Sequence, residues 1–398
     1  MQIVPVTNEK LENEWFAVER SIYKGDKNWI PYIRQEIEKI FDPKRNKLLR
    51  SPGGEAIRWV LKDNNGKNIG RIAAFVNPAY SKEFKNVSGV GGVGFFECIN
   101  DKAAAHLMFD TAKKWLQDRG LEAMDGPINL GEKLNFWGCV IENFDAPATF
   151  GMTYNPPYYP ELFTSYGFDV YYEQHVFWRD LLAPAQEVFV RKAEMLARDP
   201  EIYTTNIRGW SDDKFAKNFM EVYNDAWGGH DGFKPLTYEA AMKTYKGLKQ
   251  VYDPDIVLFV FKKDRPIGFY INLPELNEVM KYVNGNLNLW GKLKYVFYRK
   301  FRHPQTMYGI IFGVVKDFQG KGVEGTMIKY AETDIATLGR YKYTILNWIG
   351  DFNPKMLHVC ENLGAHVWRK YATYRYYFDR NRPFERAPII GAKANKEG

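Results

Sequence analysis

The chain has 398 residues, of which 45% are hydrophobic and 26% are charged, and its formal net charge is +7. This is the composition of an ordinary globular protein, so a largely disordered chain is excluded, and the length predicts two domains. The positive charge is spread over 55 basic residues, which favours anionic ligands, but no nucleic-acid partner is expected.

The N-terminal segment, MQIVPVTNEKLENEW, contains acids where a signal peptide needs a basic start and an apolar run. No later window reaches the roughly eighteen apolar residues of a membrane-spanning helix. We therefore expect a cytoplasmic protein without stable membrane insertion. The three cysteines, Cys98, Cys139 and Cys360, lie far apart and fit neither a zinc site nor a disulfide framework. No metal is expected.

The same series of predicted elements occurs twice along the chain. This repeat predicts a first domain at 1–180, a connecting helix at 181–200, a second domain at 201–380 and a C-terminal tail at 381–398. Each half opens with a short strand and an amphipathic helix that begins at Asn8 or Ser211, both good N-cap residues. A hairpin follows, turning at Asn65 and Gly66 in the first half.

The next predicted elements are a buried strand that leads into a helix, and then a fifth strand. VGFFECIND (93–101) in the first half matches GIIFGVVKD (309–317) in the second. Each half then closes with a helix that starts at an Asn-Pro pair, a turn at glycine and a final pair of strands, within 155–180 and 353–379. Five landmarks in the same order favour a duplicated fold over chance similarity.

After the buried strand of the second half, the sequence reads Gln319-Gly320-Lys321-Gly322-Val323-Glu324. A glycine-rich turn that enters a helix presents bare backbone N–H groups, and these bind a diphosphate. Together with the order of elements, this loop resembles the Arg/Gln-x-x-Gly-x-Gly/Ala signature of the GNAT superfamily of acyl-CoA-dependent N-acyltransferases. The last position departs from the signature, because Glu324 replaces a small residue.

The resemblance implies an α/β fold (α+β mixed sheet) with two tandem GNAT-like domains, each a central mixed, mostly antiparallel sheet flanked by helices. It also implies acetyl-CoA or another acyl-CoA as co-substrate. The implied coenzyme A contacts are Val314, Val315, Gln319, Gly320, Lys321, Gly322, Val323, Glu324, Gly325, Thr326 and Asn353, although an N-cap role also explains Asn353.

The first half lacks this loop. Asp101 and Gly120 are 19 positions apart, whereas Asp317 and Gly339 are 22 apart, and Lys102–Ala105 form a plain helix start in place of the glycines. We expect coenzyme A to bind only the second domain.

Three residues are candidates for catalysis. Cys360 stands where many GNAT relatives have a tyrosine that protonates the leaving thiolate, but a buried packing cysteine is the alternative. Glu97 stands where the resemblance places a general base, and a salt-bridged structural role is the alternative. Asn347, at the end of a strand, either orients substrate or makes a local hydrogen bond.

Two insertions interrupt the repeat. The first, at 126–154, is rich in aromatic residues and predicts either a substrate-binding wall or a satellite core formed by Phe136, Trp137, Phe150 and Tyr154. The second insertion, at 287–304, contains several aromatic residues, five Lys or Arg residues and no Asp or Glu. For this segment we expect an amphipathic helix packed on its own domain, without strong membrane binding.

The function expected from the resemblance is acyl-CoA-dependent N-acyl transfer, with a small-molecule or peptide amine acceptor in the cleft between the domains. Two alternatives stay open at this point. One is an aminoacyl-tRNA-dependent transferase of the peptidoglycan-crosslinking type, and the other is a non-catalytic acyl-CoA-binding protein. The sequence does not indicate the oligomeric state.

Overall fold

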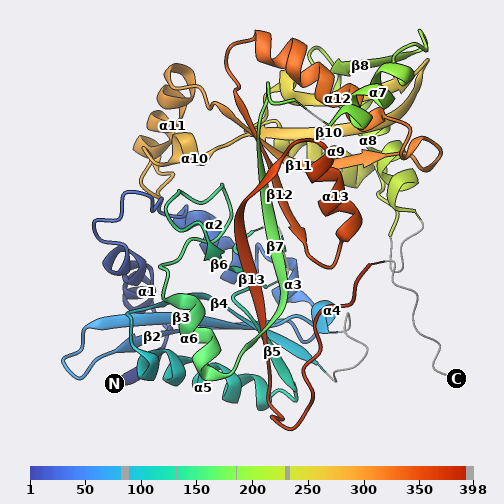
Figure 1. Ribbon diagram of the computed structural model, residues 1–398. Helices are drawn as coiled ribbons and strands as arrows, with labels where there is room; N and C mark the ends of the chain where they lie inside the picture. Colours follow the sequence, from blue (N-terminus) through green and yellow to red (C-terminus); the bar gives the residue numbers. More distant parts are fainter. Residues whose placement is uncertain (82–88, 131–132, 134, 185, 229–233, 391–398) are drawn as a thin grey trace, which may run out of the picture.

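The computed structural model describes residues 1–81, 89–130, 133, 135–184, 186–228 and 234–390. Within these residues one continuous mixed sheet runs through the molecule, with helices along both halves (Figure 1). No helix there is both long and apolar enough to cross a bilayer.

Apart from β7 and β13 in the middle, the strands of the first half come first in the sheet, and those of the second half come last. In order across the sheet they are β1 (Gln2–Pro5), β2 (Glu55–Lys62), β3 (Asn68–Val76), β4 (Val90–Cys98), β5 (Ala123–Gly126), β13 (His366–Tyr377), β7 (Asp169–Asp180), β12 (Tyr343–Gly350), β11 (Thr306–Val314), β10 (Arg265–Pro274), β9 (Val257–Lys262) and β8 (Ile202–Asn206). The short β6 (Cys139–Glu142) also pairs with β13. Only β4 with β5 and β11 with β12 are parallel among the described pairs. The expected mixed, mostly antiparallel sheet is confirmed.

The helices follow the predicted repeat. In the first half they are α1 (Glu9–Ile22), α2 (Arg34–Phe41), α3 (Lys47–Arg50), α4 (Pro78–Ser81), α5 (Lys102–Gln117) and α6 (Tyr159–Tyr166), and α7 (Glu187–Leu196) links the halves. In the second half they are α8 (Asp212–Trp227), α9 (Tyr238–Leu248), η1 (Pro254–Ile256), α10 (Asn277–Met280), α11 (Leu289–Phe301), η2 (Lys316–Phe318), α12 (Val323–Tyr330), η3 (Ala331–Ile335) and α13 (Pro354–Asn362). As predicted, the side chains of Asn8 and Ser211 cap α1 and α8 by accepting backbone N–H bonds.

The end of each half differs from the prediction of a final strand pair. Each half instead ends in one long strand, β7 or β13, and these two strands are exchanged. β13 pairs with β5 of the first half, β7 pairs with β12 of the second half, and the two pair with each other. The domain boundaries at residues 180, 200 and 380 stay a prediction, because each closing strand lies in the other half of the sheet.

Buried arginines fix the exchanged strands in place. Arg375 of β13 forms a two-point ion pair with Asp125 of β5, at 2.7 and 2.8 Å, and both side chains are buried. Arg369 of β13 donates to the backbone carbonyls of Asn143, Ala146 and Pro147 in the first insertion. These bonds satisfy the buried guanidinium groups.

Arg179 of β7 does the same for the second half. Its Nε donates to the carbonyl of Leu363 at 2.6 Å, and the guanidinium also pairs with Glu332. Each half is therefore completed by a strand and a buried cation from the other, and we expect the two halves to unfold together.

Replacing Arg375 with Leu should lower the free energy of unfolding by about 3–5 kcal/mol, because Asp125 would stay buried without its partner. The loss should appear in both halves as one cooperative transition in urea, followed by tryptophan fluorescence and by circular dichroism. The matched control is Arg265→Leu, which removes an ion pair with Asp317 that is about half exposed. That change should cost less than about 1 kcal/mol. Two separate transitions in the Arg375 variant would contradict the shared-sheet explanation.

Candidate functional site

A large cavity lies where the two halves meet, and its lining combines apolar side chains with charged ones, among them Glu36, Lys39, Arg45 and Lys47. Its volume is about 770 Å³, within the range of sites for drug-sized ligands. The first half contributes apolar side chains from α2, α3 and the first insertion, and the second half contributes residues around α10. The main apolar residues of the lining are Ile33, Ile40, Leu48, Leu130, Phe136, Phe150, Leu273, Leu276, Met280 and Leu287.

A buried carboxylate, that of Glu275, lies directly behind one wall of this cavity. Its Oε1 accepts hydrogen bonds from the backbone N–H of Phe150 and of Asn277, both at 2.9 Å, and these two residues line the cavity. Its Oε2 has no hydrogen-bond partner within the described part of the chain. Burial raises the pKa of Glu275 to about 8, although the two N–H groups lower it. A carboxyl group with such a pKa can exchange a proton near neutral pH.

Tyr308, on β11, belongs to the same buried region. Burial, and after it the Glu275 carboxylate, raise the pKa of Tyr308 well above its usual value. Its hydroxyl lies beside that of Thr149 without the geometry of a hydrogen bond, and neither hydroxyl has another partner among the described residues. Buried polar atoms usually have partners, so this group of three residues is unusual.

Just beyond Tyr308 the sheet opens. The pairing of β11 with β12 ends at Gly309 and Leu346, although both strands continue. The register of β11 against β10 skips Ile310, which marks a bulge. A small cavity of about 30 Å³ lies in the opening, lined by Phe312, Met356 and Glu324 among others. Tyr308 itself does not line this small cavity; it lies on β11 one residue before the last pair with β12, and its side chain packs with Val140 and Tyr371.

The predicted glycine loop lies at the far end of this opening, at the start of α12. Gly320 and Gly322 adopt φ angles of +71° and +100°, which only glycine adopts without strain. Burial raises the pKa of Glu324, and the nearby backbone N–H groups of Glu324 and Gly320 lower it to a smaller extent. The Glu324 side chain therefore lies close to the backbone N–H of Gly320.

The linking helix α7 packs on the same loop. A Cβ atom on Gly322 would lie 2.6 Å from the backbone oxygen of Lys192, so the two backbones are in close contact. Lys321 is exposed and lies over the ring of Phe318. The other predicted coenzyme A contacts are used within the fold. Val314, Val315, Val323 and Gly325 are buried. Gln319 donates a hydrogen bond to the carbonyl of Val314, Thr326 donates one to the carbonyl of Val323, and Asn353 caps α13.

The three catalytic candidates occupy different surroundings. Cys360 is completely buried against Phe177 and Ala365, and burial raises the pKa of its thiol to about 12, which favours the packing role. The amide oxygen of Asn347 accepts the backbone N–H of Trp348 at 2.8 Å, the local hydrogen bond given as its alternative.

Glu97 lies on β4 of the first half, in a closed network of its own. The hydroxyls of Tyr23 and Tyr159 donate to its Oε2 at 2.8 and 2.7 Å, and Arg71 lies 3.5 Å from Oε1. Burial raises the pKa of Glu97 to about 7, against the lowering by Arg71. These partners of Glu97 all belong to the first half, and the ion pair with Arg71 fits the salt-bridged structural role given as its alternative.

The four residues predicted to form either a substrate-binding wall or a satellite core have different surroundings. Phe136 and Phe150 line the large cavity, and Tyr154 lines a small cavity beside Glu97. Trp137 is fully buried and its indole donates to Tyr172 and Thr373 in a separate core, which fits the satellite-core alternative.

Sequence reasoning did not select Glu275 and Tyr308. Glu275 follows Pro274 at the end of a strand, and Tyr308 lies in an apolar strand, so neither stands in a recognisable motif. Within the described residues, no group of three or more His, Cys, Asp or Glu side chains is arranged to hold a metal ion.

The sequence matches no protein-family model. It is 26% identical over 394 residues to a protein named "Bacterial ceramide synthase" from Caulobacter vibrioides (strain NA1000 / CB15N), covering 95% of this chain and 97% of the other. It is 24% identical over 371 residues to Protein YghO of Escherichia coli (strain K12), covering 90% and 91% of the two chains.

Two solved structures share the arrangement of elements. A tandem GNAT protein from the clavulanic acid biosynthesis pathway has a TM-score of 0.52 at 10% identity, covering 96% of this chain and 99% of the other. The GCN5-related glucosamine N-acetyltransferase region of a fungal multi-domain GH3 beta-N-acetylglucosaminidase has a TM-score of 0.53 at 14% identity, covering 94% of this chain and 38% of that longer one. The chain is therefore a tandem GNAT-fold protein, in which two GNAT-like halves share one sheet.

Proposed function

We propose that this protein is an N-acyltransferase that moves an acyl group from an acyl-CoA thioester to the primary amine of a long-chain lipid. The observation that carries the proposal is the Glu275 carboxylate, which is buried behind the wall of the large cavity and has one oxygen without a partner among the described residues. The apolar part of this lining suits a hydrocarbon chain, and Glu275 lies directly behind the lining residues Phe150 and Asn277.

The relative named as a ceramide synthase supports the same class of substrate, since the alignment covers nearly all of both chains. A ceramide is the amide of a fatty acid with a long-chain amino alcohol. Its synthesis therefore joins an acyl group to a lipid amine, which is the reaction that the cavity and the GNAT fold together favour.

In the proposed reaction the amine nitrogen attacks the thioester carbonyl carbon, a C–N bond forms and the C–S bond breaks. Glu275 takes the proton from the nitrogen, and Tyr308, which stays protonated at neutral pH, donates its proton to the leaving sulfur. The proton on Glu275 then returns to Tyr308. The products are the amide and free coenzyme A, and both residues are restored.

For the acyl donor, we place the coenzyme A arm in the cleft between β11 and β12 and its diphosphate on the loop at 319–325. A thioester in this cleft would lie beside Tyr308, where the strands begin to diverge. Because the Glu324 carboxylate lies close to the N–H of Gly320, it must move aside when the diphosphate binds. Glu324 therefore competes with the donor.

Glu275→Gln should lower kcat/KM for a long-chain amine by about a hundredfold or more, because the amide cannot accept the proton. In the wild type, kcat/KM should rise with pH through a midpoint near 8, since only the ionised carboxylate is a base and burial raises its pKa to about 8. The matched control is Glu97→Gln, a buried carboxylate in the other half. This control should keep kcat/KM within about tenfold and keep the midpoint. A large loss of kcat/KM in the Glu97 variant alone would indicate that the general base lies in the first half.

The cavity predicts a chain-length effect. Met280→Trp adds bulk to the cavity wall, and it should raise KM for a long-chain amine at least about tenfold while leaving a short-chain amine unaffected. KM is measured for amines of increasing chain length with one fixed acyl-CoA. A second series uses one fixed amine and acyl-CoAs of increasing chain length. Met195→Trp, at an exposed position on α7, is the control. If the variant changes only the acyl-chain preference, the cavity holds the donor chain and the assignment of the amine is wrong.

Glu324→Ala should strengthen coenzyme A binding by about tenfold, equivalent to about 1.4 kcal/mol, because it removes the carboxylate that lies close to the loop. Isothermal titration calorimetry and the ligand-induced rise in Tm measure the effect. Glu194→Ala, which removes an exposed carboxylate from α7, should change nothing. Unchanged or weaker binding in the Glu324 variant would show that the diphosphate does not use this loop.

A further inference from the structure

Helix α11 presents a row of large apolar side chains to solvent. Leu289, Trp290, Leu293, Val296, Phe297 and Phe301 are all more than half exposed, and Trp290 is 73% exposed. The segment is an amphipathic helix packed on its own domain, as expected, but its apolar side chains face solvent. Single exposed apolar residues are common on proteins, but six on one helix of 13 residues form a continuous patch.

The six residues lie on one side of the helix. With roughly 100° of rotation per residue, they fall within an arc of roughly 140°. Lys292 and Lys294 flank the arc, one at each edge, and Lys300 lies within it toward the C-terminal end. No Asp or Glu occurs anywhere between residues 287 and 304. This arrangement is typical of helices that lie in the headgroup layer of an anionic membrane.

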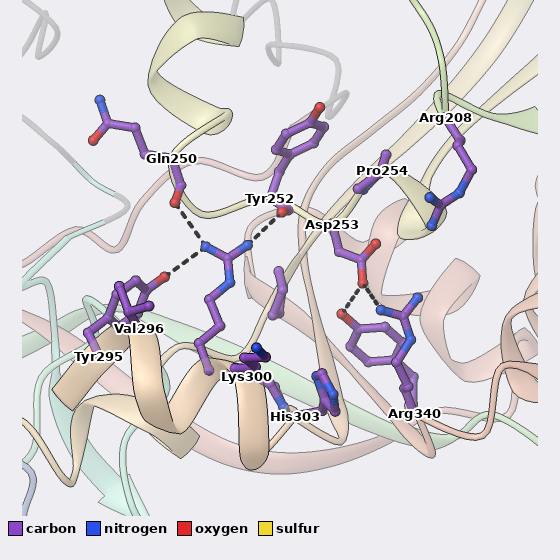
Figure 2. A pocket seen from close by; sticks show the side chains of 14 residues that line it. Arg208, Gln250, Tyr252, Asp253, Pro254, Tyr295, Val296, Lys300, His303 and Arg340 are labelled. Carbon is purple, nitrogen blue, oxygen red and sulfur yellow. Dashed lines mark hydrogen bonds and ion pairs between the residues drawn. The ribbon is translucent and has the colours of Figure 1, made fainter. Parts of the chain in front are cut away.

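The opposite side of α11 is fixed to the protein. Arg299 donates to the backbone carbonyls of Gln250 and Tyr252, each at 2.9 Å, and to the hydroxyl of Tyr295 at 3.1 Å (Figure 2). Tyr298 stacks on Tyr282, with ring centroids 4.1 Å apart. The helix is thus held by its polar and aromatic inner side, and its apolar side needs no rearrangement to become accessible.

The helix also lies next to the large cavity. Leu287, just before α11, lines the cavity, and Tyr295 of α11 packs on a cluster with Leu276 and Met280, which line it too. A surface bound by α11 would therefore lie close to a cavity suited to a hydrocarbon chain. Because the exposed side of α11 lies near this cavity, a lipid surface is favoured over a protein as the partner that α11 binds.

We propose that α11 is a membrane-docking helix that binds the surface of an anionic lipid bilayer, with its six apolar side chains among the acyl chains and its lysines at the lipid phosphates. Burial of the apolar side chains supplies most of the affinity. The cations add a contribution that depends on salt and on the lipid charge. Docking places the neighbouring cavity at the membrane, where a lipid enters without crossing water.

The test is co-sedimentation of the full-length protein with vesicles. Vesicles of phosphatidylcholine containing about one third phosphatidylglycerol should bind the wild type at least about tenfold more tightly than vesicles of phosphatidylcholine alone. The combined change Trp290→Ser, Leu293→Ser and Phe297→Ser should weaken binding at least about tenfold at both low and high salt. Lys292→Glu with Lys294→Glu should weaken it mainly at low salt, because salt screens the electrostatic contribution.

Two control variants match these changes elsewhere on the surface. Val188→Ser with Met195→Ser removes exposed apolar side chains from α7, and Lys243→Glu with Lys246→Glu reverses exposed charges on α9. Both should bind vesicles like the wild type, and all variants should keep the wild-type Tm because the altered side chains are exposed. The proposal is overturned if the wild type does not sediment with anionic vesicles, or if the controls lose as much binding as the α11 variants. It is also overturned if light scattering shows that α11 instead joins two copies of the chain.

Discussion

The exchange of β7 and β13 between the two halves is the constraint on which the remaining structure depends. Each strand is hydrogen-bonded within the other half, and the buried pair between Arg375 and Asp125 joins β13 to β5 away from water. An unpaired charge at that depth is costly, so the register of β13 is strongly specified. This register then brings Arg369 under the first insertion, where it organises three loop carbonyls.

The candidate site follows from this arrangement. The insertion held by Arg369 belongs to the first half, yet its Phe150 donates to Glu275 of the second half. The cavity wall and the buried carboxylate therefore meet only because the halves share one sheet. The bulge at Ile310 lies beside this junction, where β11 leaves β12 and Tyr308 faces the Glu275 region.

The sequence by itself determined the elements and their repeat. Local signals were sufficient for this, since caps, turns and hydrophobic periodicity act over a few residues. Asn8 and Ser211 begin helices as predicted, and the loop at 319–325 lies at a helix start. The order of elements also identified the GNAT fold. Phe136 and Phe150, which were selected from the long aromatic insertion, line the large cavity, and their role in binding substrate stays a prediction.

Only the tertiary structure decided which strands exchange, which carboxylate is buried beside the cavity and which side of α11 stays exposed. Pairing between strands far apart in sequence has no local signature. The sequence therefore predicts that β7 and β13 each pair within their own half. Burial raises the pKa of Glu275, and burial is a property of the packed molecule. The apolar arc of α11 can be read from the sequence, but the same amphipathic pattern fits a helix packed on a core and a helix facing a membrane. Only the contacts of Arg299 and Tyr298 with the protein show that the apolar side is exposed.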